Sequence, residues 1–389
     1  MDTYDVAVIG AGLSGLWCAR ALSRRGLSVA IVDAHPAVDR VVGTTGIFVR
    51  RTFDDFDLPP RSLGPAIRSV VLYSPRRRAI AFESAHDEFR IGDMRALYRA
   101  LLDDCLRAGA TWLPATRYVD LQAAGAASVL QLLDLKSRAT ARITARFVVG
   151  ADGARSSVAS DLGLSANRDF LVGLEDVYDD TAVTSPPALH CFLEPRLAPG
   201  YIAWIARDGR DAHVGLAGDA LRCRPAPSLR AFTRSVRQTV GAPFVRRRDR
   251  RGGLIPWNGV LPRIACLRGL LVGDAAGAVS PLTAGGLDGC IRLAEFAAQI
   301  IPEQLRAPHS DIIASYDGRR FAARFIARRW MREFLRNCGE RALELACAAL
   351  TVPAVRAIGA HIFFGRGSFP DTGSRRVLRG TRVAHRPAG

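Results

Sequence analysis

The sequence lacks the long hydrophobic runs that mark a membrane-spanning protein. No stretch of its 389 residues approaches the ~20 uninterrupted apolar residues that a spanning helix requires. The first apolar stretch begins at Val6, has no basic segment before it and leads directly into glycines, which is not typical of a secretory signal. We therefore expect a cytoplasmic protein.

Paired cysteines are also missing. The eight cysteines are scattered along the chain, and none forms the CxxC or CxH spacing of a zinc or iron–sulfur site. We therefore expect no metal site and buried, reduced thiols.

Lysine is almost absent: Lys136 is the only one, so arginine carries the net charge of +17. The excess is largest in residues 301–389, which hold 16 arginines against 7 acidic residues. An arginine-rich coding bias would give the same charge. A basic surface can also meet an anionic membrane or a phosphorylated substrate. No nucleic-acid-binding module accompanies it, so nucleic acid is not an expected partner. Apolar residues and arginines recur with helical spacing between residues 310 and 350, which predicts helices that cap the substrate site and contact an anionic membrane peripherally.

The N-terminal segment contains the pattern of a dinucleotide-binding unit. A short apolar strand over residues 4–10 leads into Gly10-x-Gly12-x-x-Gly15, a helix over residues 16–25, and a second strand that ends at Asp33. Gly10 suits the tight turn, Gly12 lets the backbone approach a pyrophosphate, and Gly15 lets the helix pack on the strand. Asp33 can bond the ribose hydroxyls and would repel a 2′-phosphate. The unit therefore predicts FAD or NAD, not NADP.

Two later strands end in acidic motifs. Residues 147–153 form an apolar strand that ends in Asp152-Gly, and residues 270–277 form another that ends in Gly273-Asp274. Pro281 and the pair Gly285-Gly286 follow, and then a helix is expected over residues 287–301.

These three ordered motifs resemble the flavoprotein superfamily of para-hydroxybenzoate hydroxylase and geranylgeranyl reductase over roughly residues 4–300. The resemblance implies noncovalent FAD. It further implies that Asp274 bonds the ribityl chain and that Gly285 and Gly286 open a helix facing the flavin pyrimidine edge, where a helix N-terminus stabilises negative charge. Arg95 and Asp152 match family positions near the cofactor, although Asp152 also suits a plain strand-end turn.

Two stretches look more like the geranylgeranyl reductase branch. One is Val-Gly-Thr-Thr-Gly-Ile around Thr44, where that branch often carries cysteine; the other is Gly-Tyr-Ile-Ala-Trp-Ile, with Tyr201 and Trp204. The branch pattern expects Phe-Pro where Ile205-Ala206 stands. The resemblance implies that Tyr201 and Trp204 line a substrate cavity beside the flavin. We expect Phe192 and Trp257 to line the same apolar cavity. On a regular strand, residues three apart face opposite sides, so a turn or bulge is required.

The expected fold is α/β, with a Rossmann-like FAD lobe, an antiparallel β-sheet substrate lobe and a C-terminal helical region. The FAD-binding domain is expected to be discontinuous, over residues 1–67, 93–156 and 262–300. The substrate sheet is expected over residues 68–92 and 157–261, and the helical region and tail over residues 301–389.

The resemblance implies a FAD-dependent oxidoreductase that reduces, or desaturates, carbon–carbon bonds of a small, apolar or prenyl-like substrate. The alternatives are a flavin-dependent monooxygenase acting on a small organic or aromatic molecule, and a non-catalytic flavin-binding protein. A halogenase is a less favoured alternative, because it would need a lysine that relays the halogen and Lys136 is the only lysine. No second GxGxxG is present, so the electron donor is either transiently bound NAD(P)H or a protein.

Overall fold

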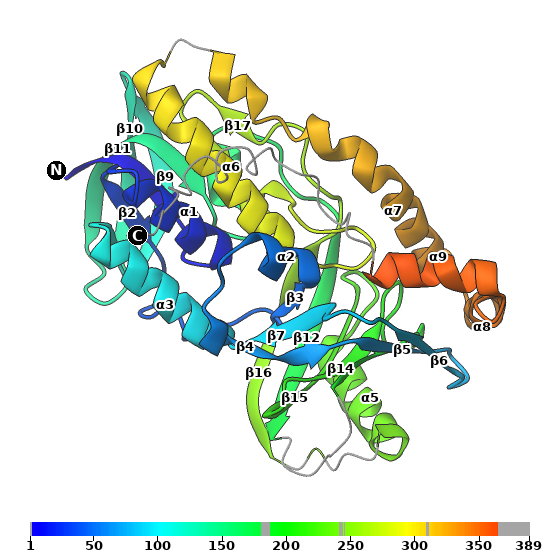
Figure 1. Ribbon diagram of the computed structural model, residues 1–389. Coiled ribbons are helices and arrows are strands. Elements are labelled where there is room, and N and C mark those ends of the chain that lie inside the picture. Colours follow the sequence, from blue (N-terminus) through cyan, green and yellow to red (C-terminus); the bar gives the residue numbers. More distant parts are fainter. Residues whose placement is uncertain (1, 180–186, 241–243, 245, 309–310, 365–389) are drawn as a thin grey trace, which may run out of the picture.

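The structure is a computed structural model that describes residues 2–179, 187–240, 244, 246–308 and 311–364. Figure 1 shows a mixed α/β protein with two main sheets and a group of helices at the C-terminal end. The fold class expected from the sequence is confirmed. The eight cysteines all lie in described ranges and are unpaired, and six of them are buried.

The first sheet has eight strands around a parallel core. The parallel order is β18-β11-β1-β2-β8, β17 pairs antiparallel with β18, and the meander β9–β10 extends from β11. The core strands are mainly apolar where they pair in parallel, because both faces of a parallel sheet are covered. The strand bounds are β1 Thr3–Ile9, β2 Val29–Val32, β8 Thr111–Leu113, β9 Thr116–Ala124, β10 Ala127–Asp134, β11 Thr140–Gly150, β17 Ala265–Cys266 and β18 Gly269–Leu271.

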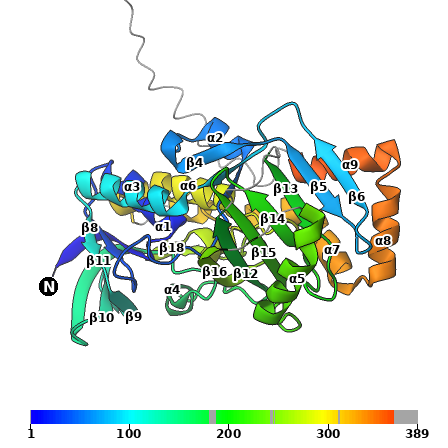
Figure 2. The ribbon, with the colours of Figure 1, turned by 90° about the horizontal axis from the view of Figure 1, so that it is seen from below.

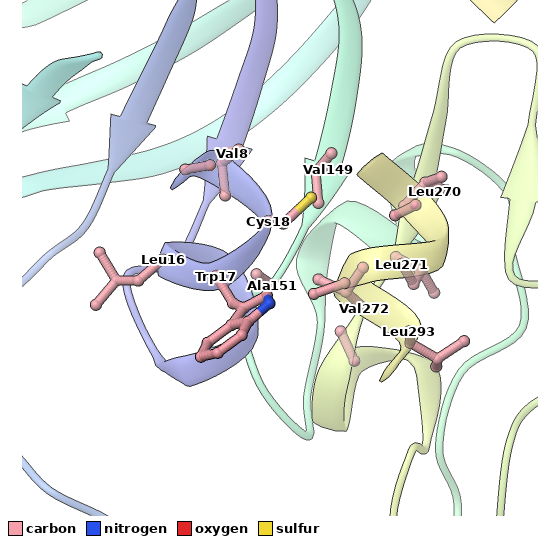
Figure 3. Close-up of a cluster of buried hydrophobic side chains, with 14 of the residues drawn as sticks. Val8, Leu16, Trp17, Cys18, Val149, Ala151, Leu270, Leu271, Val272 and Leu293 are labelled. Atoms are coloured by element: carbon pink, nitrogen blue, oxygen red, sulfur yellow. The ribbon is translucent and has the colours of Figure 1, made fainter. Parts of the chain in front are cut away.

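Helices α1 (Leu13–Ser23), α3 (Met94–Arg107) and α6 (Leu287–Arg306) form a layer over this sheet, with α1 in contact with both of the others (Figure 2). Figure 3 shows Trp17 and Cys18 of α1 packed near Val149 of β11 and the apolar strand that leads to Val272. The predicted strand, glycine turn and helix therefore share one core.

The second sheet has seven strands in the order β16-β12-β15-β14-β13-β5-β6, antiparallel except for the pair β13–β5. One face packs against α5 (Pro225–Val240) through an aromatic cluster that contains Phe192 and Phe232. The opposite face carries Trp204 and Glu175. The strand bounds are β5 Ser69–Tyr73, β6 Ala79–Glu83, β12 Phe170–Asp179, β13 Ala188–Phe192, β14 Ala203–Arg207, β15 Asp211–Asp219 and β16 Arg247–Pro256.

A small three-stranded sheet, ordered β3-β7-β4, accompanies the two large ones. The remaining short elements lie near it or at strand ends. Their bounds are β3 Ile47–Val49, β4 Leu63–Ile67, β7 Phe89–Gly92, α2 Arg50–Asp55, α4 Ser157–Asp161, and the 3-10 turns Pro60–Ser62, Gly273–Ala276 and Asp311–Ser315. The proposed domain boundary at residue 67 separates β4 from β5, which belong to different sheets; the domain division itself stays a prediction.

The C-terminal part is helical, as the arginine spacing predicts: α7 (Arg319–Asn337), α8 (Glu340–Ala349) and α9 (Pro353–Phe364) run along the second sheet (Figure 1). Phe363 of α9 packs against Phe82 of β6. The expected tail after residue 364 lies outside the described residues. Within the described ranges, no single helix is long and apolar enough to cross a membrane. The pair α8–α9 meets the length and composition criterion only when joined, across a bend of 107°.

Candidate functional site

The glycine turn between β1 and α1 has the geometry that its three glycines predict. Gly10 has a φ of +103°, and a Cβ there would lie 2.3 Å from the carbonyl oxygen of Ala151. A Cβ on Gly15 would lie 2.0 Å from the carbonyl oxygen of Gly10, so the helix can approach the strand only without one. A Cβ on Gly12 would meet no atom within 4 Å. The backbone at the start of α1 is therefore open to a ligand, as a pyrophosphate site requires.

Asp33 lies at the edge of this turn, just after β2. Its Oδ2 accepts a hydrogen bond from the Ala11 N–H at 2.7 Å, and its Oδ1 accepts one from the His35 N–H at 2.7 Å. The contact with Ala11 fixes the carboxylate beside the glycine turn. That position fits the predicted role of bonding a ribose, which stays a prediction.

Asp274 has a largely enclosed carboxyl group with little support from the protein. The preceding residue, Gly273, has a φ of +62° and lies against α1, since a Cβ on Gly273 would lie 2.2 Å from Ser14 Oγ. Among the described residues, the only hydrogen-bond partner of the carboxyl group is the Cys290 thiol, at 4.0 Å. Loss of solvation raises the pKa of Asp274 to about 6. Since enclosed acceptors are normally satisfied, this group fits a ligand hydroxyl such as one of the FAD ribityl chain.

The loop from Pro281 to Gly286 leads into α6. Gly286 is the N-cap residue of that helix and provides no side-chain cap, so backbone N–H groups of the first turn remain available. The carbonyl of Gly285 accepts a hydrogen bond from the Ser280 N–H at 3.0 Å, and the carbonyl of Pro281 accepts one from Arg332 Nε at 2.7 Å. The loop is thus held in place from the side of α7, and the start of α6 lies beside Asp274, since a Cβ on Gly286 would lie 3.6 Å from Asp274 Oδ1. That the helix N-terminus faces the flavin stays a prediction.

Two predicted cofactor residues have protein partners instead. Asp152 accepts hydrogen bonds from Ser156 Oγ at 2.6 Å and from the N–H groups of Ser157 at 2.7 Å and Val158 at 3.2 Å, so its carboxylate supports the start of α4. This geometry matches a plain strand-end turn, the alternative to a cofactor contact at Asp152. Arg95 pairs with Asp249 at 2.8 Å and also donates to the carbonyl of Asp39. The cofactor roles of Asp152 and Arg95 stay predictions.

The segment around Thr44 is tied down by side chains from other elements. The carbonyl of Thr44 accepts a hydrogen bond from Arg251 Nη1 at 3.1 Å, and the Thr44 hydroxyl accepts one from the Gly46 N–H at 3.2 Å. The neighbouring Thr45 hydroxyl donates to Glu175. The loop is therefore anchored to the second sheet.

Tyr201 and Trp204 pack together in one apolar cluster. Tyr201 lies in the turn before β14, and Trp204 lies within that strand. The turn allows the two rings to lie on the same side, as their spacing in the sequence requires. Tyr201 Oη donates to the carbonyl of Thr283 at 2.5 Å, next to the loop before α6. The cluster also contains Leu171, Ala217, Trp257, Ile255 and Ala284.

Phe192 does not join these rings. Cys191 pairs with Trp204 across β13 and β14, so Phe192 points to the opposite face, where it stacks on Tyr73 at a centroid distance of 4.3 Å. The expectation that Phe192 lines the same cavity is therefore wrong, because side chains alternate along a strand.

The sheet face beneath Trp204 has few side chains. Gly173 of β12 pairs with Gly253 of β16 and with Ala217 of β15, and Gly215 lies two residues before Ala217, opposite Glu175. The Trp204 ring lies across Gly215, where a Cβ would come within 2.4 Å of it. A Cβ on Gly253 would meet nothing within 4 Å. The glycines concerned are Gly173, Gly215 and Gly253.

A buried polar group beside this surface was not predicted from the sequence. His213 Nδ1 lies 3.1 Å from Glu175 Oε1, and its Nε2 lies 3.3 Å from Asp208 Oδ2. Burial alone would lower the pKa of His213, but the charges of the two carboxylates and their hydrogen bonds outweigh it and raise the pKa to about 9. Glu175 gives no signal within its strand.

Comparison with known proteins supplies the context for this geometry. A family model described as FAD binding domain matches residues 3–329. The chain is 27% identical to a digeranylgeranylglycerophospholipid reductase of Methanothrix thermoacetophila over 77% of this chain and 78% of that protein. It is 26% identical to a geranylgeranyl diphosphate reductase of Rhodobacter capsulatus, over 73% and 71% respectively.

Solved structures show the same fold. A geranylgeranyl bacteriochlorophyll reductase-like protein of Thermoplasma acidophilum superposes with a TM-score of 0.80 at 18% identity, covering 97% of this chain and 99% of that one. A flavin-dependent monooxygenase solved with FAD and substrate superposes with a TM-score of 0.70 at 17% identity, covering 94% and 73%. The fold alone is therefore shared by reductases and monooxygenases.

Proposed function

Because the chain belongs to the FAD binding domain family, whose model covers residues 3–329, we propose that this FAD-dependent oxidoreductase reduces carbon–carbon double bonds of a prenyl-like substrate. The observation that carries the proposal is the apolar cluster of Tyr201, Trp204 and Trp257, which adjoins the loop before α6 and a glycine-lined sheet face. Relatives of the chain are named as reductases of geranylgeranyl compounds.

Three positions of the first lobe support the binding of FAD. The open backbone at Gly12 would hold the pyrophosphate, Asp33 the ribose, and Asp274 the ribityl chain. The N-terminus of α6 would face the pyrimidine ring and stabilise its negative charge. When bound and reduced, FAD supplies a hydride.

The residues of the chain then have two tasks: to exclude water and to orient an apolar chain. Trp257 is buried and Trp204 is fixed flat over Gly215, so they provide a rigid apolar wall. Saturating a double bond also requires a proton. Tyr201 donates its hydroxyl hydrogen to the Thr283 carbonyl, and burial raises its pKa, so it is a poor acid. We therefore assign the proton to water.

The reaction can be tested under argon. The protein is photoreduced, mixed with geranylgeranyl diphosphate or with a digeranylgeranyl glycerophospholipid, and followed by flavin absorbance. We expect substrate-dependent reoxidation without oxygen. The rival monooxygenase reaction, favoured by the structural neighbour solved with FAD and substrate, predicts no reoxidation until oxygen is admitted.

We further propose that α7 contacts an anionic membrane surface. Ile326, Trp330 and Phe334 are four residues apart, so they share one side of the helix, and their exposed fractions are 54%, 74% and 56%. Exposed Arg324 and Arg329 flank this stripe. An apolar stripe bordered by arginines is typical of helices that lie in a membrane interface. A membrane-bound position would also suit a prenyl lipid substrate.

Vesicle flotation at low and high salt tests this surface, with vesicles of phosphatidylcholine alone or mixed with phosphatidylglycerol. We expect salt-sensitive flotation with the anionic vesicles, at roughly 1 kcal/mol per basic residue near the surface, and its loss in the double variant Trp330→Ser, Phe334→Ser. Val119→Ser is the matched control, because Val119 is 50% exposed on β9 of the first sheet. Equal behaviour of the double variant and the wild type would contradict the proposal.

A further inference from the structure

A chain of alternating charges runs from α3 to the turn between β14 and β15, beneath the loop that contains Thr44. Arg95 pairs with Asp249 at 2.8 Å, and Asp249 with Arg251 at 3.2 Å. Arg251 lies 3.8 Å from Glu175. His213 and Asp208 complete the chain. It joins the start of α3, next to the first lobe, to the face of the second sheet that carries Trp204.

Glu175 is the member that contacts the predicted site. It pairs with Gly215, which pairs in turn with Trp204, so the three lie in one row across β12, β15 and β14. Its Oε2 accepts hydrogen bonds from Trp204 Nε1 at 3.0 Å and from the Thr45 hydroxyl, while Oε1 faces His213. Glu175 is only 3% exposed. Burying a charge of this kind is costly unless donors surround it, and here they come from three separate elements.

We propose that Glu175 is a positioning residue, which holds the Trp204 indole and the Thr44–Gly46 loop in place for the reaction, and that protonated His213, held by Asp208, keeps it ionised. This inference rests on the proposed function for its catalytic consequence. The positioning itself follows from the contacts. In this scheme, no member of the chain of charges transfers a proton to the substrate.

The protonation state of His213 controls the arrangement. Glu175 of β12 and Asp208 of the β14–β15 turn face its two ring nitrogens, and Asp249 and Arg251 of β16 lie farther along the same chain of charges. An imidazolium can donate to both carboxylates, whereas a neutral imidazole has a single N–H. Since the pKa of His213 is raised to about 9, both bonds are present at neutral pH. One of them is lost as the pH rises through that value.

The test follows the Trp204 indole by NMR in the FAD-loaded, full-length protein with ¹⁵N-labelled tryptophan. The chain has five tryptophans, so five indole signals are expected, and the Trp204 signal is the one that Trp204→Phe removes. We expect this signal to shift with a midpoint near pH 9. The shift should be absent in His213→Gln. It should persist in the control Asp176→Asn, because Asp176 is a buried carboxylate that follows Glu175 and pairs with Arg250.

Kinetics supply the second readout. Glu175→Gln should lower kcat at least about tenfold, since small misplacements of a site cost one to two orders of magnitude, while the FAD dissociation constant stays within about threefold. In the wild type kcat should fall above pH 9, and in His213→Gln that alkaline fall should disappear. A Trp204 signal that does not titrate, or an unchanged kcat in Glu175→Gln, overturns the positioning proposal. A prenyl substrate that is not turned over, with the Trp204 titration intact, overturns the proposed reaction alone.

Discussion

Helices α6 and α7 are nearly equal in length, at 20 and 19 residues, yet they bury different side chains. Helix α6 buries leucine, isoleucine, alanine and phenylalanine around almost its whole circumference and passes through the first core. Helix α7 buries Phe321, Phe325 and Arg332, and leaves Trp330 and Phe334 exposed. The helical spacing of apolar residues therefore predicts which residues share a face of a helix, but it does not predict which face is buried.

The two helices also differ in how they stabilise a buried arginine. On α6, Arg292 pairs with Asp288 at 2.9 Å and Asp55 at 2.8 Å. On α7, Arg332 makes no ion pair within the described residues. It donates instead to the carbonyls of Pro281, Gly200 and Leu282 at 2.7, 2.5 and 2.8 Å. The first arrangement balances charge, whereas the second uses a cation to join two loops of the site.

The largest effect is expected from Arg292→Met. This variant removes the cation that pairs with Asp288 and one of the two cations that pair with Asp55, which should cost about 3–5 kcal/mol of the free energy of unfolding. Urea denaturation of the FAD-loaded protein measures it. The exposed Arg306→Met, at the end of the same helix, is the control. A loss below 1 kcal/mol would show that the pair on α6 is dispensable.

Arg332→Met comes next, because it leaves three carbonyl groups without their donor. Each unsatisfied buried acceptor costs ~1–3 kcal/mol, and we expect about 3 kcal/mol in total after the loops relax. Arg332→Lys should recover part of this, since an ammonium group can still reach some of the carbonyls. Equal stability of Arg332→Met and the wild type would mean that α7 does not hold the Gly200 and Pro281 loops.

Asp33→Ala separates cofactor affinity from the helices. Loss of a charge-assisted hydrogen bond should weaken FAD binding by about 1.5–3 kcal/mol, measured by fluorescence titration of the apoprotein. Asp134→Ala, at the end of β10, is the control. Acid precipitation should release all flavin into the supernatant, and flavin left in the pellet would contradict noncovalent binding. An unchanged affinity in Asp33→Ala would mean that the ribose is bound elsewhere.

The smallest effect is expected on the outer side of α7. Trp330→Ser should change the free energy of unfolding by no more than about 0.5 kcal/mol, as is usual for exposed positions. Phe325→Ala on the same helix should cost about 3–5 kcal/mol, because Phe325 is buried. Thermal unfolding of both variants compares the two sides. A large loss in Trp330→Ser would place that side against protein.

The sequence predicts the first lobe best because its signals are local. Three glycines, a strand on each side of a helix and Asp33 define the turn through backbone geometry alone, and the helix that starts after Gly286 follows from its apolar spacing. The same locality explains the doubtful role of Asp152. A strand-end Asp-Gly pair suits both a ligand and a helix start, and the contacts with Ser156 and Val158 support the second.

Long-range partners explain what the sequence does not predict. Glu175 and Asp176 are adjacent acids in an apolar strand, and they point to opposite faces. Their partners, His213 and Arg250, are 38 and 74 residues away in the sequence. Arg332 likewise has the same local pattern as its exposed neighbours on α7. Nothing near these residues in the chain indicates which of them is buried.

Product analysis tests the central claim most directly. Photoreduced protein is mixed under argon with a geranylgeranyl substrate in deuterated water, and a parallel sample is exposed to ¹⁸O₂. We predict a product that gains two hydrogens for each bond reduced, both of them deuterium, because the N5 hydrogen of the photoreduced flavin also comes from the solvent, and no ¹⁸O in either sample. A product that forms only with oxygen and carries ¹⁸O would contradict the assignment as a reductase of carbon–carbon double bonds.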